Sequence, residues 1–465
     1  MHKYLFFDDR DLFRVENFTR CAGKAEIVPD SLFRDDLYNL SFSSGWVFCL
    51  TNKRYRMLYV GRDENGLFHL LSAQSEDGIR FEPENTVPLL NLTDRTADNE
   101  VLVFSEADIG LIIEDPTGSI DERYKMLFCQ HNRTSLYVHG ILFVSPDLLH
   151  WTRKESNEWN NGCEPIVSAF RNDKRGCFTI VMRPDWGIRT MGIKETTDWN
   201  YYSEYQPCLQ CDCEDQPLDE LYGMPCFPYF GRFIGLPLIY RGFDKGNFHK
   251  YNGGTIEAYL AYSDDGRYWM RSLRTPFISG NDPETDKAVG ARLPLVWPSS
   301  FGEDENGNIL VYGTASEKEH GRAFDSGRGG CFCVWKIRRD GFVSLKTRSD
   351  TIGTLSTREM LWHGGESHLN LKVSCATMAV YETRGDFFST SLIALDGFEH
   401  NNCVPFSGDS VDWIPKWNSG RTLSELNGRT IVLEVRIRNG EIFSLSGDCS
   451  PMFKVDAARE RNKNG

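Results

Sequence analysis

Ser263-Asp-Asp265-Gly-Arg-Tyr-Trp269 is one of four copies of a short motif that recurs along the chain. The other copies are Ser75-Glu-Asp77-Gly-Ile-Arg-Phe81, Ser145-Pro-Asp147-Leu-Leu-His-Trp151 and Thr196-Thr-Asp198-Trp-Asn-Tyr-Tyr202. Each copy has Ser or Thr, any residue, Asp, and then an aromatic residue four positions after the Asp. A fifth, degenerate copy is Arg339-Asp340-Gly341-Phe342. Four copies with the same internal spacing indicate a structural repeat.

The residue types of the motif predict a tight turn. Ser and Asp side chains bond to backbone amides of their own turn, Gly supplies a positive φ, and the aromatic side chain packs on the next repeat. The Asp residues recur at roughly 50–75 residue intervals, and strand-rich repeats of this size indicate β-propeller blades. We therefore expect the Asp residues of the four complete motifs to be structural.

Short β-branched and aromatic runs bounded by Gly, Asp, Asn or Pro fill the intervals, as in strands. They predict an all-β chain with a five-bladed β-propeller over residues 31–345, preceded by an N-terminal strap over residues 1–30. The motif is absent from residues 346–465, where evenly spaced short strands predict a β-sandwich with a frayed, charged tail. A length of 465 residues fits such a two-domain chain.

Composition restricts the partners that the chain could have. A formal net charge of -14 argues against nucleic acids and anionic membranes. Cys208, Cys211 and Cys213 form the only cysteine cluster, and no second cluster completes a metal site, so we expect no metal and no cofactor. The N-terminus has no apolar run long enough for a signal peptide, which predicts a cytoplasmic protein with reduced thiols. The oligomeric state is left open.

The predicted architecture resembles known carbohydrate-active enzymes. Five blades followed by a sandwich resemble the invertase and levanase type of glycoside hydrolase (family 32) and its arabinanase and xylosidase relatives (family 43). More closely, the chain resembles a group of bacterial family 32-like proteins over nearly its whole length. The strings that carry this resemblance are Glu122-Arg-Tyr-Lys-Met126, Tyr222-Gly-Met-Pro-Cys-Phe-Pro-Tyr-Phe-Gly-Arg-Phe-Ile-Gly235, Arg339-Asp-Gly-Phe-Val-Ser-Leu345, Leu369-Asn-Leu and Gly408-Asp-Ser-Val-Asp-Trp413.

The resemblance implies a glycosidase whose acids stand at the starts of innermost strands in three blades. Such an enzyme needs a proton donor for the leaving oxygen and a second carboxylate that acts as nucleophile or base. Glu164, in Gly162-Cys-Glu-Pro165, matches the Glu-x-Pro segment of these relatives and is the expected general acid. Asp108, sixteen residues before Tyr124, matches the second-blade acid of these relatives. Its expected role is to orient Glu164 or to tune its pKa.

The first blade departs from the family pattern. Counting back fourteen to sixteen residues from Tyr55 reaches residues 39–41, which contain no acid. The nearest acids are Asp35 and Asp36, and of these Asp36 is our candidate for the missing nucleophile or base. The fourth blade offers Asp219 and Glu220 at an equivalent depth, and these residues are the alternative candidates.

Several loop residues are candidates for contacts with the sugar. An indole can stack on a sugar ring and a guanidinium can bind hydroxyl groups. The candidates of this kind are Arg183, Trp186, Arg189, Trp159, Arg241 and His249.

Three functions stay open at this point. The first is a glycosidase for small oligosaccharides such as fructosides or arabinosides. The second is a glycoside phosphorylase that uses the same funnel, with phosphate held by the cationic candidates. The third is a non-catalytic carbohydrate-binding propeller, which the missing first-blade acid favours. Product formation and its dependence on phosphate distinguish the three.

Overall fold

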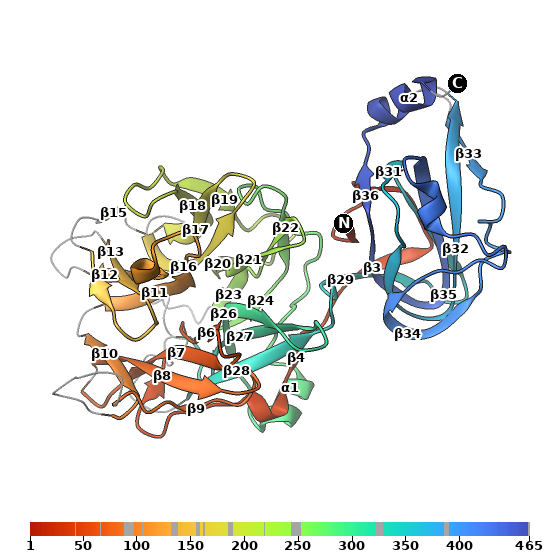
Figure 1. Ribbon diagram of the computed structural model, residues 1–465. Coiled ribbons are helices and arrows are strands. Elements are labelled where there is room, and N and C mark those ends of the chain that lie inside the picture. Colours follow the sequence, from red (N-terminus) through yellow and green to blue (C-terminus); the bar gives the residue numbers. More distant parts are fainter. Residues whose placement is uncertain are drawn as a thin grey trace. The chain divides into compact units, whose positions relative to one another are not determined.

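The computed structural model describes most of the chain in two compact units (Figure 1). One unit comprises residues 24–337, and the other comprises residues 1–23 together with 338–465. The described residues are 1–41, 43–65, 67–87, 97–104, 107–131, 138–154, 159–160, 163–184, 189–217, 219–242, 253–320, 329–385 and 390–463. Strands dominate both units, as predicted, and the α-helices of these ranges are α1 (Pro283–Val289) and α2 (Lys454–Lys463).

The unit of residues 24–337 begins with three consecutive antiparallel sheets. The first sheet contains β5 (Asn39–Leu40), β6 (Trp46–Cys49), β7 (Tyr55–Arg62), β8 (Phe68–Ser75), β9 (Glu82–Pro83) and β10 (Glu100–Phe104). The second contains β11 (Ala107–Glu114), β12 (Tyr124–His131), β13 (Val138–Ser145), β14 (Thr152–Arg153) and β15 (Trp159–Asn160). The third contains β16 (Cys163–Asn172), β17 (Cys177–Pro184), β18 (Met191–Thr196) and β19 (Gln206–Leu209).

Two further sheets complete this unit. The larger one runs in the order β20 (Asp219–Gly223), β23 (Leu238–Gly242), β24 (Gly254–Ala258), β26 (Leu295–Glu303), β27 (Ile309–Ser316), β28 (Gly330–Ile337) and β4 (Glu26–Ile27). The smaller one contains β21 (Cys226–Tyr229), β22 (Arg232–Gly235) and β25 (Ala261–Ser263). The parallel contact between β24 and β26 is a single residue pair. The sheets have a propeller-like arrangement (Figure 1), and the exact number of blades stays a prediction.

The repeated motif forms the predicted turn. Ser75 Oγ accepts the amide of Gly78 at 2.9 Å, and Asp77 Oδ1 accepts the amides of Ile79 and Arg80, both at 2.8 Å. The copies at residues 145–151, 196–202 and 263–269 repeat these bonds. The residue after each Asp has a positive φ, and the residues at that position are Gly78, Leu148, Trp199 and Gly266.

The degenerate copy at Asp340 forms a different structure in the other unit. Its carboxylate is buried, accepting Lys3 Nζ at 2.7 Å and Ser444 Oγ at 2.6 Å. Its own φ is +57°, whereas in the four complete motifs the next residue has the positive φ. Asp340 therefore joins the N-terminal strand to β35 (Thr430–Gly447) instead of forming a blade turn.

The second unit is built around β35. Its direct neighbours are β1 (His2–Leu5), β29 (Val343–Thr347), β30 (Ile352–Thr357), β31 (Met360–Trp362) and β32 (His368–Gly385). Strands that pair further out are β2 (Leu12–Glu16), β3 (Phe18–Ala22), β33 (Thr390–Ala394), β34 (Phe406–Trp413) and β36 (Cys449–Pro451). The first 23 residues are thus integral to this unit, and its sandwich architecture stays a prediction.

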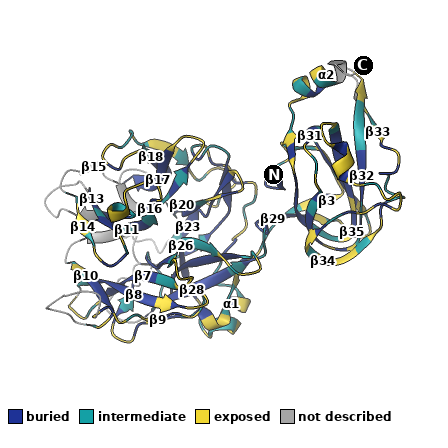
Figure 2. Ribbon diagram, viewed as in Figure 1, coloured by how far each residue is buried: buried dark blue, intermediate teal, exposed yellow. Residues whose placement is uncertain are grey.

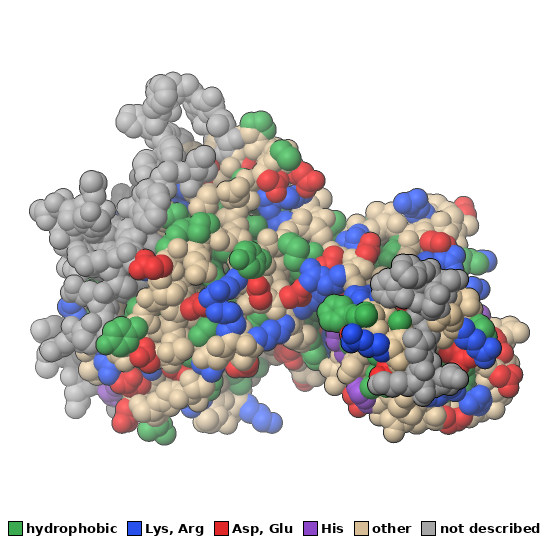
Figure 3. Space-filling model, turned by 90° about the horizontal axis from the view of Figure 1, so that it is seen from above, with side chains coloured by type: hydrophobic (Ala, Val, Ile, Leu, Met, Phe, Trp, Pro, Cys, Tyr) green, Lys and Arg blue, Asp and Glu red, His purple; other side chains and the backbone are tan. Residues whose placement is uncertain are grey.

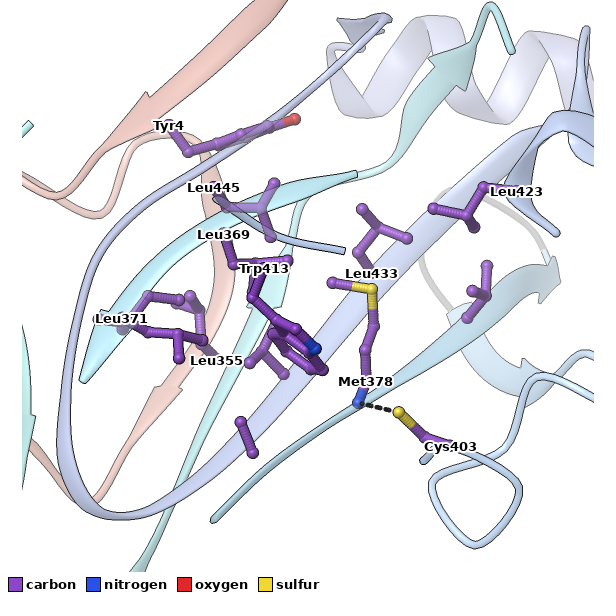
Figure 4. Close-up of a cluster of buried hydrophobic side chains, with 14 of the residues drawn as sticks. Tyr4, Leu355, Leu369, Leu371, Met378, Cys403, Trp413, Leu423, Leu433 and Leu445 are labelled. Carbon is purple, nitrogen blue, oxygen red and sulfur yellow. Dashed lines mark hydrogen bonds between the residues drawn. The ribbon is translucent and has the colours of Figure 1, made fainter. Parts of the chain in front are cut away.

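A continuous hydrophobic core holds this unit together, and Figure 2 shows buried segments along its central strands. Trp362, Leu369, Met378 and Leu433 are fully buried in it. Figure 4 shows side chains from both ends of the chain in this core, with the amide of Met378 donating to Cys403 Sγ at 3.2 Å. Of the tail over residues 453–465, which we expected to fray, residues 454–463 form α2, and Ala457 is buried.

Charged side chains are mixed on the surface. On the face that Figure 3 shows, basic and acidic side chains are interspersed, so the net charge of -14 is not gathered there into one acidic patch. Among the described residues, no helix has the length and hydropathy that crossing a membrane requires.

Candidate functional site

Acidic residues stand at equivalent positions in three neighbouring strands. Asp108, Glu164 and Glu220 are each the second residue of β11, β16 and β20. Each of these strands is at the end of its sheet order, β11 lies beside β16, and β16 lies beside β20. First strands of successive propeller sheets surround the central axis. We therefore expect the three acids at the same end of that axis.

The strand that carries Glu164 is irregular at this residue. The register of β16 against β17 shifts between Cys163 and Ile166, and such bulges change the direction of side chains near functional sites. The side chains of Glu164 and Asp108 lie outside the described part of the chain. For these two acids the structure therefore gives the backbone position, and their roles stay predictions.

Glu220 is held by a guanidinium. Its Oε2 forms a short ion pair with Nη1 of Arg189, and the two side chains are 19% and 11% exposed. The guanidinium carbon of Arg189 also lies 5.3 Å from the ring centroids of both Tyr222 and Tyr240. Ion pairing and two cation–π contacts fix Arg189, and Arg189 in turn fixes the carboxylate.

A second guanidinium shares the ring of Tyr222. The central carbon of Arg183 lies 4.9 Å from that ring centroid, and Arg183 is buried. The Tyr222 hydroxyl forms a 2.9 Å hydrogen bond with Nε2 of His320. Burial, reinforced by the charges of Arg189 and Arg183, lowers the pKa of His320 to about 4. The imidazole is therefore neutral at pH 7. We call Arg183, Arg189, Tyr222, Tyr240 and His320 the arginine–tyrosine cluster.

Asp219, the residue before Glu220, has a different environment. Its carboxylate accepts two hydrogen bonds from Arg241, Nε to Oδ1 at 2.9 Å and Nη2 to Oδ2 at 2.8 Å. The Asp219 side chain is 3% exposed, and its hydrogen bond raises the pKa of Arg241. Because Asp219 and Arg241 are also register partners of β20 and β23, this pair stabilises the sheet.

In the first sheet the structure buries the neighbour of the candidate acid. Asp36 is exposed and precedes β5 by three residues, whereas Asp35 is buried. Asp35 accepts the amides of Leu37 and Tyr38 and, at 2.5 Å, the hydroxyl of Tyr59. The role that the sequence predicts for Asp36 stays untested.

The structure does not describe the side chains of the remaining candidates for sugar binding. Trp186 and His249 lie outside the described residues, as does the side chain of Trp159. The structure adds three residues that the sequence analysis did not select, namely Tyr222, Tyr240 and His320. Tyr222 opens one of the strings that carry the family resemblance, and that was its only signal. Tyr240 and His320 had none.

Two of the three residues in the cysteine cluster, Cys208 and Cys211, are half-buried. Burial raises the pKa of Cys208 and the pKa of Cys211, which keeps both thiols protonated at pH 7. Within the described ranges, no three His, Cys, Asp or Glu residues are arranged so that they could hold a metal ion.

Comparisons with known proteins give structural neighbours only. No protein family and no curated protein matches the chain. β-Fructofuranosidase from Schwanniomyces occidentalis, complexed with fructosyl-erythritol, is 11% identical over 91% of this chain and 97% of that chain, with a TM-score of 0.46. A thermostable family-43 glycoside hydrolase is 13% identical, over 68% of this chain and 96% of its own, with a TM-score of 0.42.

β-1,2-Mannobiose phosphorylase from Listeria innocua, in complex with β-1,2-mannobiose, is a third neighbour. It is 12% identical over 72% of this chain and 97% of its own, with a TM-score of 0.41. These neighbours are glycosidases and related sugar-processing enzymes.

Proposed function

We propose that this chain is a glycoside hydrolase that cleaves small oligosaccharides of the fructoside or arabinoside kind. The observation that carries the proposal is the row of acids at the second positions of β11, β16 and β20. Cleavage of a glycosidic bond needs two carboxylates that flank one anomeric carbon. Three neighbouring strands with equivalent acids supply such a set.

Each acid has a distinct role in this proposal. Glu164 donates the proton to the leaving oxygen, and Asp108, on the adjacent strand, orients it. Glu220 is the second carboxylate, which attacks the anomeric carbon or takes a proton from water. The ion pair with Arg189 keeps Glu220 in a fixed position, and Arg183 and Arg189 donate hydrogen bonds to sugar hydroxyls.

The test distinguishes the general acid from the second carboxylate by comparing substrates whose leaving groups differ in their need for a proton. Substrates are 4-nitrophenyl and 2,4-dinitrophenyl arabinofuranosides and xylosides, with sucrose and raffinose as natural fructosides. Glu164→Gln is expected to lower kcat/KM by roughly 10²- to 10⁴-fold on the natural substrates. It is expected to retain most of the rate on the dinitrophenyl glycosides, because that leaving group departs without a proton.

Glu220→Gly is expected to lose activity on every substrate, and added azide should restore turnover by occupying the space of the carboxylate. The anomeric configuration of the sugar that the wild type first releases, followed by NMR, tells whether the reaction retains or inverts. The matched control is Glu76→Gln, whose side chain is 83% exposed. Near-normal turnover by both site variants would refute the assignment. Turnover that requires phosphate would indicate a phosphorylase, and saturable sugar binding without product would indicate a binding protein.

A further inference from the structure

A cavity of about 500 Å³ lies in the unit formed by residues 1–23 and 338–465. Its volume falls within the range of small-molecule sites, roughly 300–1,000 Å³. The lining comes from both ends of the chain and consists of Arg10, Leu12, Phe13, Arg358, Glu359, Thr383, Leu392, Val432, Met452 and Lys454. The sugar-processing site proposed above is in the other unit, so this cavity is a separate feature.

The lining is amphipathic and contains more basic than acidic side chains. Aliphatic and thioether groups of Leu392, Val432 and Met452 provide apolar surface. Three cations, Arg10, Arg358 and Lys454, are combined with one carboxylate, Glu359. This carboxylate already accepts a short hydrogen bond from the hydroxyl of Thr383. Such a lining suits a molecule with an apolar body and a negatively charged end.

Among the cations of the lining, Arg358 is the one whose surroundings favour an anionic ligand. It is half-buried, its Nη1 donates to the carbonyl of Arg10 at 2.9 Å, and its guanidinium lies 5.7 Å from the ring centroid of Phe453. Within the described part of the chain it forms no ion pair, in contrast to Arg10, whose Nε lies 2.7 Å from Asp8 Oδ2. A half-buried guanidinium that has no carboxylate partner can bind an added carboxylate through charge-assisted hydrogen bonds.

We propose that this cavity binds an amphipathic monocarboxylate, a small molecule with an alkyl or aryl body. Its carboxylate contacts Arg358, with Lys454 adding positive charge, and its apolar body packs on Leu392, Val432 and Met452. The proposal does not depend on the glycosidase assignment, because it uses residues of the other unit only.

Calorimetric titration of the full chain at pH 7 tests the proposal with sodium octanoate as probe. One-to-one binding of octanoate is expected. Acetate, which lacks the apolar body, and 1-octanol, which lacks the charge, should each bind at least about tenfold more weakly. Arg358→Gln should weaken octanoate by a similar factor, and Leu392→Trp should block the cavity. The matched control is Arg429→Gln, which removes an arginine that is paired with Glu382 in the same unit and should leave binding unchanged.

Three outcomes would overturn the proposal: no saturable binding of octanoate, equal binding of 1-octanol, or unchanged affinity in Leu392→Trp. Melting of each variant shows whether it is folded. If Arg358→Gln does not fold, octanoate binding by Leu392→Trp and 1-octanol binding by the wild type still test the proposal.

Discussion

The guanidinium of Arg183 lies over the ring of Tyr222, with its central carbon 4.9 Å from the ring centroid. Arg189 lies over the same ring at 5.3 Å. Two like charges repel each other in a partly buried site, and the negative face of the aromatic ring offsets part of that repulsion. Tyr222 therefore sets the positions of both guanidiniums, and one of these holds Glu220.

Two substitutions of Tyr222 should distinguish the contribution of the aromatic ring to stability from that of the hydroxyl group. Tyr222→Leu removes both cation–π contacts and should cost about 2 kcal/mol or more of unfolding free energy. It should also lower kcat/KM on any substrate that Glu220 serves. Tyr222→Phe keeps the ring, loses the hydrogen bond to His320, and should cost about 1 kcal/mol. Urea unfolding measures both, with Tyr268→Leu, at a tyrosine that is 74% exposed, as control. Equal losses in the Leu and Phe variants at position 222 would contradict a role for the ring.

Stability should depend on pH through His320. Its folded pKa of about 4 lies below the ordinary histidine pKa of 6.5, so the unfolded chain takes up this proton first. The contribution is fully present above pH 6.5 and is lost as the pH falls through 6.5 towards 4. Between pH 7 and pH 5 this one group should account for a loss of about 2 kcal/mol. Urea unfolding of wild type and His320→Gln at both pH values checks this. The same loss in both proteins would show that His320 is not the group responsible.

Alanine substitutions at Gly266 and Gly176 should distinguish the energetic cost of backbone strain from that of steric crowding. Gly266 and Gly176 have φ of +76° and +67°, so alanine at either position pays the left-handed penalty of about 1–2 kcal/mol. At Gly266 a Cβ would also lie 2.8 Å from Asn172 Nδ2, whereas at Gly176 it meets nothing within 4 Å. Gly266→Ala should therefore be the more destabilising by about 1 kcal/mol or more. Thermal or urea unfolding of the two variants measures the difference, and equal losses would mean that the repeated turn yields to the added methyl group.

Local sequence was sufficient for the turns and insufficient for the arrangement of the N-terminus. Ser75 and Asp77 bond to amides within three residues, so the motif alone predicted the turn. The pairing of β1 with β35 joins residues that are more than 400 positions apart. A four-residue strand gives no sequence signal for such a partner, and only the folded sheet shows it.

The same distinction applies to the candidate site. The repeated pattern predicted that Glu164 and Glu220 lie near the starts of strands, because it gives the order of the strands along the chain. The local pattern gave no basis for choosing Asp36 over Asp35, because adjacent acids share it. The structure distinguishes them, because Asp35 is buried and accepts the hydroxyl of Tyr59. His320 was not predicted because its hydrogen-bond partner, Tyr222, is 98 residues away.

A buried carboxylate should control the acid stability of the unit built around β35. Glu434 is 2% exposed and accepts hydrogen bonds from Ser356 Oγ at 3.0 Å and Arg436 Nη2 at 2.9 Å, with His400 Nε2 at 3.2 Å. Burial alone would raise its pKa. The bonds from His400 and Ser356 and the charge of Arg436 outweigh burial and lower the pKa of Glu434 to about 2.

Glu434→Gln should therefore cost about 3 kcal/mol or more at pH 7, because it leaves Arg436 and His400 facing a neutral amide. The contribution of Glu434 is present above the ordinary pKa of 4.5 and is lost as the pH falls towards 2, so the variant should lose less stability than wild type in that window. Glu382→Gln, at a more exposed carboxylate paired with Arg384 and Arg429, should cost less than about 1 kcal/mol. Urea unfolding at pH 7 and pH 3.5 compares the three proteins. Equal losses for the two variants at pH 7 would mean that the network around Glu434 adds no more than a surface ion pair.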